Sequence, residues 1–160
     1  MTATGIDRIS FYTPRYYLPL TALAEARGVD PGKYLKGLGQ ENMAVPPPDE
    51  DTVTMAAAAA QPLLDGEPDI RERIDLFVHK LLNLPARCRV VEVKQACYSG
   101  TAALRMACAL VGHAPQSSAL VIASDVARYK LGSPGEPTQG SGAAALLVTA
   151  KPRLLTIEPY

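Results

Sequence analysis

The chain has 160 residues, 48% of them hydrophobic, and its 16 Lys and Arg residues balance its 16 Asp and Glu residues. This length and apolar content indicate one globular domain and exclude an intrinsically disordered chain. The balanced charge gives no general attraction to nucleic acid or to a membrane surface, and no apolar run is long enough to span a bilayer. We therefore expect a cytoplasmic protein that binds neither.

A strand and two short helices are expected first. Gly5 to Tyr12 alternates apolar and polar residues, which is the period of a half-buried strand. Thr21 can cap a helix over residues 22–27, and Gly28 ends it. Asp30-Pro31 then combines a capping residue with proline at the first helical position, so it predicts the start of another helix.

A longer helix, Thr52 to Leu64, follows an acidic loop whose carboxylates suit the positive end of the helix dipole. After it, Ile74 to Leu76 begins like a strand but runs straight into the helical pattern of Phe77 to Leu84. An α/β chain normally spends about five or six residues on a buried strand and then forms a loop. The junction between Leu76 and Phe77 is therefore unusual.

The rest of the chain alternates strand and helix. Strands are expected over Cys88–Lys94, Ser118–Ser124, Ala143–Thr149 and Leu154–Glu158, with a helix over Tyr98–Val111. This alternation predicts an α/β fold with a mostly parallel sheet flanked by helices.

Cys97 stands between a predicted strand and a predicted helix. The unsatisfied N–H groups and the positive dipole at a helix start favour a nucleophilic thiolate. The small residues 99–102 would let a substrate approach and let nearby N–H groups hold a developing oxyanion. A buried, inert cysteine is the alternative, and it is the commoner case for such a local pattern.

The other cysteines, Cys88 and Cys108, and the two histidines, His79 and His113, lack metal-ligand spacing. No metal site is therefore expected. Cys108 is expected to fill the core, because nothing near it in the sequence would activate its thiol.

A Gly- and Pro-rich loop covers residues 131–142 and contains neither a P-loop pattern nor a Gly-x-Gly-x-x-Gly between strand and helix. Two interpretations stay open. The loop is either a surface connection between two strands or a segment that folds over a thioester substrate, with Thr138 as a hydrogen-bonding group.

Several short segments, spread in order along nearly the whole chain, match one family. They are Gly5-Ile6-Asp7 with Phe11-Tyr12, Ala26-Arg27-Gly28-Val29-Asp30-Pro31 with Lys33, Gly37-x-Gly39-Gln40, Ala96-Cys97-Tyr98 with Gly100-Thr101-Ala102, Ser124-Asp125 with Ala127-Arg128-Tyr129, and Gly135-Glu136-Pro137-Thr138-Gln139-Gly140. Together they resemble the hydroxymethylglutaryl-CoA synthase family, a branch of the thiolase-like condensing enzymes. The resemblance implies the N-terminal half of a thiolase-like α/β fold, with a mostly parallel or mixed sheet.

The resemblance also implies a chemistry. In this family a cysteine takes the acetyl group of acetyl-CoA as a thioester. A glutamate then removes a methyl proton, and the enolate attacks an acetoacetyl thioester. No cofactor besides these substrates is implied. Carried onto this sequence, Cys97 is the nucleophile, and five residues line the acyl or pantetheine path. They are Asp30, Lys33, Tyr129, Gly135 and Thr138.

Residues 93–100 are most similar to the family branch that serves polyketide β-branching, where the acceptor rides on an acyl carrier protein. The acceptor is therefore expected to be carried either by CoA, as in the mevalonate pathway, or by an acyl carrier protein.

Two departures from the family bear on function. The Gly/Ala-Thr-Glu segment that supplies the general base is absent after Leu76, and the chain ends before the second half of the fold and its catalytic histidine. Residues 1–160 are thus expected to form one N-terminal thiolase-like domain that forms a homodimer or needs the second half. Glu92 and Glu136, the nearest carboxylates, are not expected to replace the base. The alternative function is a non-catalytic module that binds a carrier protein or partner subunit.

Overall fold

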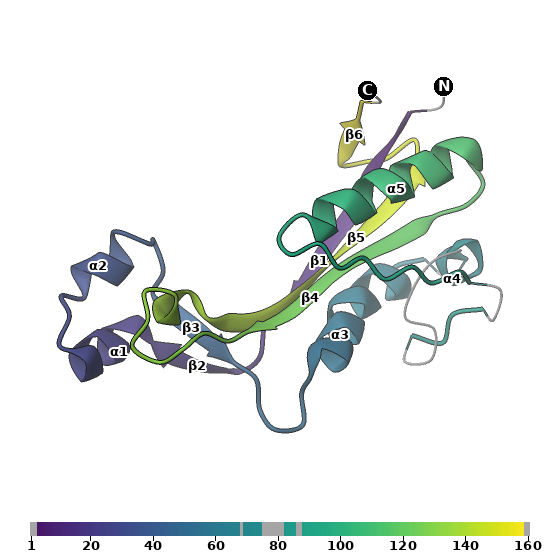
Figure 1. Ribbon diagram of the computed structural model, residues 1–160. Coiled ribbons are helices and arrows are strands. Elements are labelled where there is room, and N and C mark those ends of the chain that lie inside the picture. Colours follow the sequence, from purple (N-terminus) through teal and green to yellow (C-terminus); the bar gives the residue numbers. More distant parts are fainter. Residues whose placement is uncertain (1–2, 68, 75–81, 86–87, 159–160) are drawn as a thin grey trace. The chain divides into compact units, whose positions relative to one another are not determined.

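The computed structural model describes residues 3–67, 69–74, 82–85 and 88–158 (Figure 1). The chain forms two compact units. The first unit comprises Met1–Tyr12, Ala56–Ala123 and Ala143–Tyr160, and the second comprises Thr13–Met55 and Ser124–Gly142.

A four-stranded sheet with the order β4-β5-β1-β6 is the framework of the first unit. Its strands are β1 (Thr4–Tyr12), β4 (Ala119–Ala127), β5 (Gly140–Ala150) and β6 (Leu155–Ile157). β1 is antiparallel to both β5 and β6, and its pairing with β5 shifts by one residue at Asp7. Ile74 makes a parallel bridge with Ser118, just before β4. The sheet is therefore mixed, with more antiparallel pairing than the strand–helix alternation suggests.

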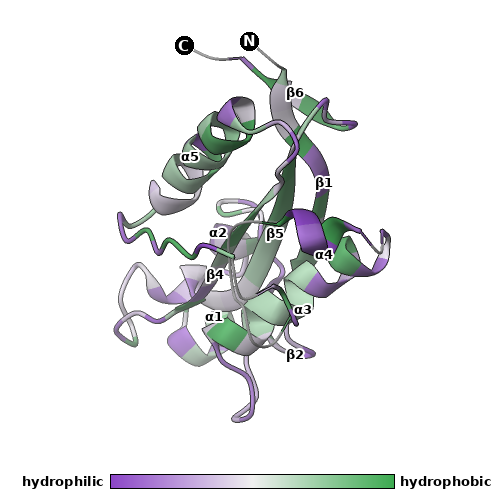
Figure 2. Cartoon of the chain, turned by 90° about the vertical axis from the view of Figure 1, so that its right-hand side faces the viewer, coloured by the Kyte–Doolittle hydropathy of each residue, from purple (hydrophilic) through white to green (hydrophobic). Residues whose placement is uncertain are grey.

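Helices cover both faces of this sheet. Figures 1 and 2 show α5 (Ser99–His113) on one side, and α3 (Thr52–Asp65) and α4 (Ile70–Arg73) on the other. Ala107 and Val111 of α5 pack on β4 and β5, whose residues are largely coloured as hydrophobic in Figure 2. The alanines of α3 are buried at three of five positions, because small side chains allow close approach.

The second unit is smaller and is built on a two-stranded antiparallel sheet of β2 (Tyr16–Pro19) and β3 (Asn42–Val45). Two helices, α1 (Leu20–Arg27) and α2 (Gly32–Leu35), join the strands. A single 3₁₀ turn, η1 (Glu136–Thr138), lies in the Gly-rich loop. The apolar core of the second unit consists of Leu20, Leu23 and Met43.

The predicted helices Thr52–Leu64 and Tyr98–Val111 are confirmed to within two residues, as α3 and α5. Of the predicted helix Phe77–Leu84, only residues 82–84 are described, and they are not helical. The short helix α4 was not predicted.

Gly28 ends α1 with a φ of 61°, and the Asp30 carboxylate accepts the N–H of Gly32 at 2.9 Å at the start of α2. Thr21 is not a cap, which corrects the prediction. The helix begins at Leu20, two residues before the predicted start, and Pro19 flanks it. The N–H of Leu20 donates to the carbonyl of Glu41 at 2.8 Å.

The predicted strand over Cys88–Lys94 is wrong. In the part of the chain that the structure describes, this segment joins neither sheet as a strand, and Arg89 is its single bridge position. Val90 is 56% exposed and Val91 is 43% exposed. Residues with high strand propensity form a strand only where a neighbouring strand pairs with them through backbone hydrogen bonds. The unusual junction at Leu76–Phe77, together with His79, lies outside the described residues.

None of the helices within the described ranges is long and apolar enough to cross a membrane. The cytoplasmic location stays a prediction.

In the first unit, the buried carboxylate of Asp7 forms an ion pair with the exposed side chain of Arg153. Asp7, which is 7% exposed, accepts hydrogen bonds from the backbone N–H, Nε and Nη2 of Arg153 at 3.0, 3.0 and 2.6 Å. Arg153 Nη2 also donates to Glu67 at 2.7 Å. The Arg153 guanidinium holds the pKa of Asp7 below its ordinary value of 3.8. The charged Asp7 therefore stabilises the folded state above that value, and this contribution is lost as the pH falls.

We expect Asp7→Asn to lower the free energy of unfolding by about 2 kcal/mol at pH 7, because charged hydrogen bonds are lost in a buried site. The difference from the unsubstituted chain should shrink as the pH falls below the ordinary pKa of 3.8. Urea unfolding at several pH values measures it. Asp125→Asn, at an exposed carboxylate, is the control. A constant difference across this pH range would contradict the electrostatic account.

Candidate active site

Cys97 lies at the apex of a tight turn that leads into α5. It is exposed and directly precedes Tyr98, the residue that flanks the helix start. The N–H of Tyr98 donates to the carbonyl of Gln95, and the N–H of Ser99 donates to that of Ala96, both at 3.1 Å. The helix start that the sequence predicts behind this thiol is confirmed. The interpretation of Cys97 as a buried cysteine does not hold.

Backbone strain marks the same turn. Ala96 has a φ of 45°, in the left-handed region that residues with a Cβ rarely adopt. Such strain persists only where surrounding bonds enforce it, and it concentrates at functional sites. Here the Ser99 hydroxyl accepts the N–H of Gln95 at 2.6 Å and closes the turn around the cysteine.

We expect Ser99→Ala to slow alkylation of Cys97 by iodoacetamide by up to about tenfold, since one hydrogen bond that fixes the turn is lost. Ser99→Thr, which keeps the hydroxyl, should restore most of the rate. Mass spectrometry of the Cys97 peptide follows the reaction. The control is Ser124→Ala, where the lost hydroxyl donates to the Thr52 carbonyl at 2.7 Å. Equal rates for all four chains would show that the hydroxyl does not hold the turn.

The other two cysteines are half-buried. Burial raises the pKa of the Cys108 thiol, so less of it is thiolate at neutral pH. Cys108 also packs against the core cluster of α5, β4 and β5. The prediction that Cys108 fills the core is confirmed.

The second unit brings together three of the five predicted substrate residues. The Thr138 hydroxyl donates to the Gly135 carbonyl at 2.8 Å, and the N–H of Tyr129 donates to the Gln139 side chain at 2.7 Å. A Cβ added to Gly135 would lie 3.1 Å from the ring of Tyr129, so glycine allows the ring to pack on the backbone. Tyr129, Gly135 and Thr138 therefore belong to one folded loop.

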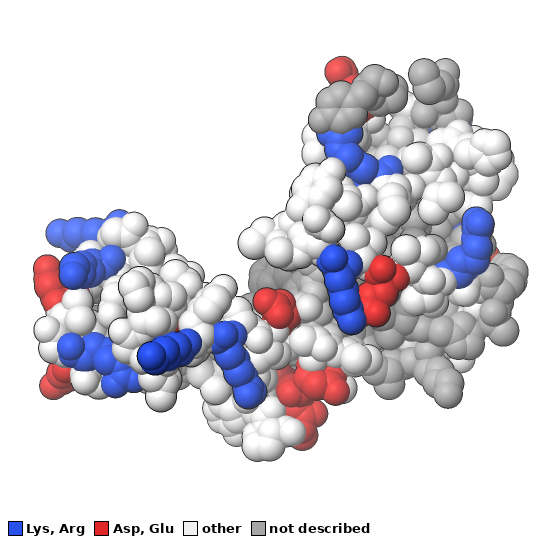
Figure 3. Space-filling model, in the orientation of Figure 1, with Lys and Arg blue, Asp and Glu red and all other residues white. Residues whose placement is uncertain are grey.

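Asp30 and Lys33 lie at the start and within α2 of the same unit. Asp30 is occupied in the helix-start hydrogen bond, and Lys33 is exposed. Figure 3 shows basic side chains gathered over the part of the molecule that holds α1 and α2. The exposed basic residues of this unit include Arg15, Lys33, Lys36, Arg128 and Lys130. They would suit an anionic ligand. Cys97 belongs to the first unit.

Neither candidate carboxylate is available as a base. Glu136 is 3% exposed and accepts Arg27 Nε at 2.8 Å and Nη2 at 2.6 Å. The Arg27 guanidinium lowers the pKa of Glu136 to about 2, so this carboxylate does not take up a proton near neutral pH. Glu92 is an exposed surface residue 3.2 Å from Lys94. The sequence singled out Glu136 only as part of a motif. Arg27 also lies in a matching segment, but nothing in the sequence linked it to Glu136, 109 residues away.

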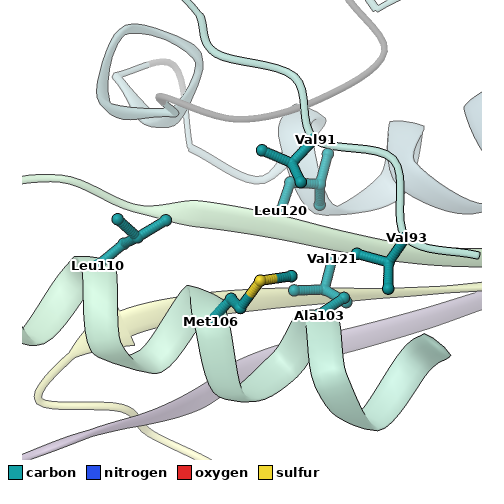
Figure 4. Close-up of a pocket in the computed structure, with 7 residues that line it drawn as sticks. All are labelled: Val91, Val93, Ala103, Met106, Leu110, Leu120 and Val121. Carbon is teal, nitrogen blue, oxygen red and sulfur yellow. The ribbon is translucent and has the colours of Figure 1, made fainter. Parts of the chain in front are cut away.

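An apolar pocket lies along α5 in the first unit (Figure 4). Ala103, Met106 and Leu110 of the helix face Leu120 and Val121 of β4. The remaining lining residues, Val91 and Val93, come from the segment 88–94. Cys97 does not line this pocket. Across the described residues, no group of three His, Cys, Asp or Glu side chains could hold a metal ion.

Comparison with known proteins gives relatives that match nearly the whole chain. No protein-family model matches the chain. A hydroxymethylglutaryl-CoA synthase of Enterococcus faecalis is 44% identical over 171 residues, which cover 96% of this chain and 44% of the relative. The solved structure of an HMG-CoA synthase complexed with CoA superposes with a TM-score of 0.90 at 38% identity, covering 99% of this chain and 45% of that one.

The chain is a homologue of the hydroxymethylglutaryl-CoA synthases. The HMG synthase of the curacin biosynthetic pathway, solved in complex with an acetyl donor-ACP, is also similar, with a TM-score of 0.87 at 35% identity, covering 98% of this chain and 43% of that one. The expected fold class, the N-terminal portion of a thiolase-like fold with a mixed sheet and flanking helices, is confirmed. The chain spans somewhat less than half the length of the relatives it matches.

Proposed function

We propose that the chain carries the acetyl-accepting cysteine of a hydroxymethylglutaryl-CoA synthase-type acyltransferase. The observation that supports it best is the exposed Cys97 at a strained turn before α5. Its thiolate would attack the carbonyl carbon of acetyl-CoA and form a new C–S bond. The oxyanion would collapse, the old C–S bond would break, and CoA would leave as a thiolate. N–H groups near the helix start would hold the oxyanion.

The second unit would bind the thioester. Tyr129, Gly135 and Thr138 share one loop, and together with Asp30 and Lys33 they would line the acyl and pantetheine path. The exposed basic side chains of this unit suit the phosphates of CoA or the phosphate that joins pantetheine to a carrier protein. This supports acetyl-CoA as the donor and an acetoacetyl group on CoA or on an acyl carrier protein as the acceptor.

An internal segment would be missing from this chain. The alignment with the Enterococcus faecalis relative runs over 171 positions, more than the 160 residues of the chain. This supports a segment that the relative has and this chain lacks, and we place it after Leu76. The exposed Val90, Val91 and Met106 would then be covered by this segment, by the second half of the fold, or by a second copy in a homodimer.

A second candidate function is a non-catalytic thiolase-like module that binds an acyl carrier protein or a partner subunit. The positions of Glu92 and Glu136 favour it, because neither carboxylate can act as the base for condensation. Incubation with acetyl-CoA followed by intact mass measurement separates the two. A covalent acetyl adduct supports the acyltransferase, and a folded chain without one supports the module.

A further inference from the structure

We propose that Arg27 and Glu136 form a positioning pair that fixes the two groups of substrate-binding residues against each other. This proposal rests on the proposed function, because it takes the loop 129–139 and the segment 30–33 as the thioester site. Neither residue is proposed to touch the substrate.

The Arg27–Glu136 ion pair connects two segments that are far apart in the sequence. Arg27 is the last residue of α1, and Glu136 begins η1 in the Gly-rich loop. The guanidinium and carboxylate meet through two parallel hydrogen bonds of 2.6 and 2.8 Å. Glu136 also accepts the N–H of Gly132 at 2.9 Å. One carboxylate thus joins the end of α1 to both the turn and the 3₁₀ helix of the loop.

Both residues of the pair lie close in the sequence to predicted substrate residues. Gly28 follows Arg27 and turns the chain, with a φ of 61°, into the segment that carries Asp30 and Lys33. Gly135 and Thr138 flank Glu136 closely in the sequence, and they are joined by the Thr138 hydroxyl. A displacement of the pair would therefore move both groups.

The burial of Glu136 argues for a specific role. Its side chain is 4% exposed, whereas that of Arg27 is 35% exposed. Burying a carboxylate costs free energy unless its partners compensate, and an apolar pair of similar size often gives equal stability. Both Glu136 oxygens are already occupied by donors of this chain. The two hydrogen bonds of the bidentate pair fix the relative orientation of the two segments, which an apolar contact would not do.

Three variants test the pair in this chain: Arg27→Met, Glu136→Gln, and the two together. The first readout is the rate of Cys97 acetylation against acetyl-CoA concentration. We expect each single variant to raise the half-saturating concentration of acetyl-CoA about tenfold. The reason is that loss of one charged hydrogen-bonded contact weakens binding by about this factor. The maximal rate should stay within about twofold, since Cys97 is untouched. The double variant should resemble the single ones, because both remove the same interaction.

The second readout is hydrogen exchange of the backbone amides, which needs no activity. The variants should speed exchange across residues 131–139 about tenfold and leave α5 unchanged. Glu136→Asp keeps the charge but shortens its reach, and it should give a smaller increase. Arg73→Met removes an exposed arginine of α4 in the first unit, and it should change neither readout.

The outcomes separate the two proposals. Unchanged exchange in residues 131–139 overturns the pair, whatever the activity. Faster exchange with an unchanged half-saturating concentration also overturns it, because the loop then does not position a substrate. An unsubstituted chain that takes no acetyl group overturns the proposed function, and the exchange readout still decides whether the pair holds the loop.

Discussion

Replacing Cys97 with alanine is expected to abolish acetylation of this chain by acetyl-CoA. Cys97 is the exposed cysteine, whereas Cys88 and Cys108 are half-buried, and burial raises the pKa of the Cys108 thiol. Intact mass spectra, recorded after incubation with acetyl-CoA, should show one added acetyl group on the unsubstituted chain and none on Cys97→Ala.

The matched controls are Cys88→Ala and Cys108→Ala, which should both accept the acetyl group at the original rate. Cys97→Ser tests the chemistry of the atom, because a hydroxyl at the same position is far less nucleophilic than a thiolate. An acetyl adduct that persists in Cys97→Ala would remove this residue from the mechanism.

The second large effect concerns condensation. We expect the acetylated chain to react with acetoacetyl-CoA about 10² to 10⁴ times more slowly than the Enterococcus faecalis relative, because a positioned general base is worth that factor. Glu136 is locked on Arg27 with a pKa of about 2, and Glu92 is an exposed partner of Lys94. Chromatographic measurement of hydroxymethylglutaryl-CoA over time compares the two proteins.

Two variants sharpen this comparison. Glu92→Gln and Glu136→Gln should leave any residual condensation rate of the saturated, acetylated chain within about twofold, since neither carboxylate takes the methyl proton. Condensation at the rate of the relative would contradict the account. A rate lost only in Glu92→Gln would identify a base that the geometry does not indicate.

Local sequence signals predicted most of the fold. The alternation in Gly5–Tyr12 predicted β1, and the apolar face behind Cys97 predicted α5. Gly28 ends α1 because glycine adopts a left-handed conformation without a Cβ clash. In each of these cases the residues that set the structure lie within one or two helical turns of each other, so the pattern is visible in the sequence.

The errors concern structure that depends on distant partners. Val90, Val91 and Val93 have strand propensity, but a strand forms only where another strand pairs with it. Among the described residues, the segment 88–94 belongs to neither sheet. Thr21 lies inside α1, because the helix begins at Leu20, whose N–H donates to the distant Glu41 carbonyl. The Arg27–Glu136 pair joins residues 109 positions apart, and without related sequences nothing linked them.

The backbone strain at Ala96 could not be predicted from the sequence either. Alanine has no preference for a positive φ, so its conformation comes from the Gln95–Ser99 hydrogen bond and the helix that follows. The identity of Cys97 as a candidate was predicted, and the turn that presents it was found only in the structure.

The most direct test locates the acetyl group after brief exposure to acetyl-CoA. Tandem mass spectrometry of the peptides that carry Cys88, Cys97 and Cys108 resolves the three sites. We expect a hydroxylamine-sensitive thioester on Cys97 alone. An acetyl group on another cysteine or on lysines, or none on a folded chain, would contradict it.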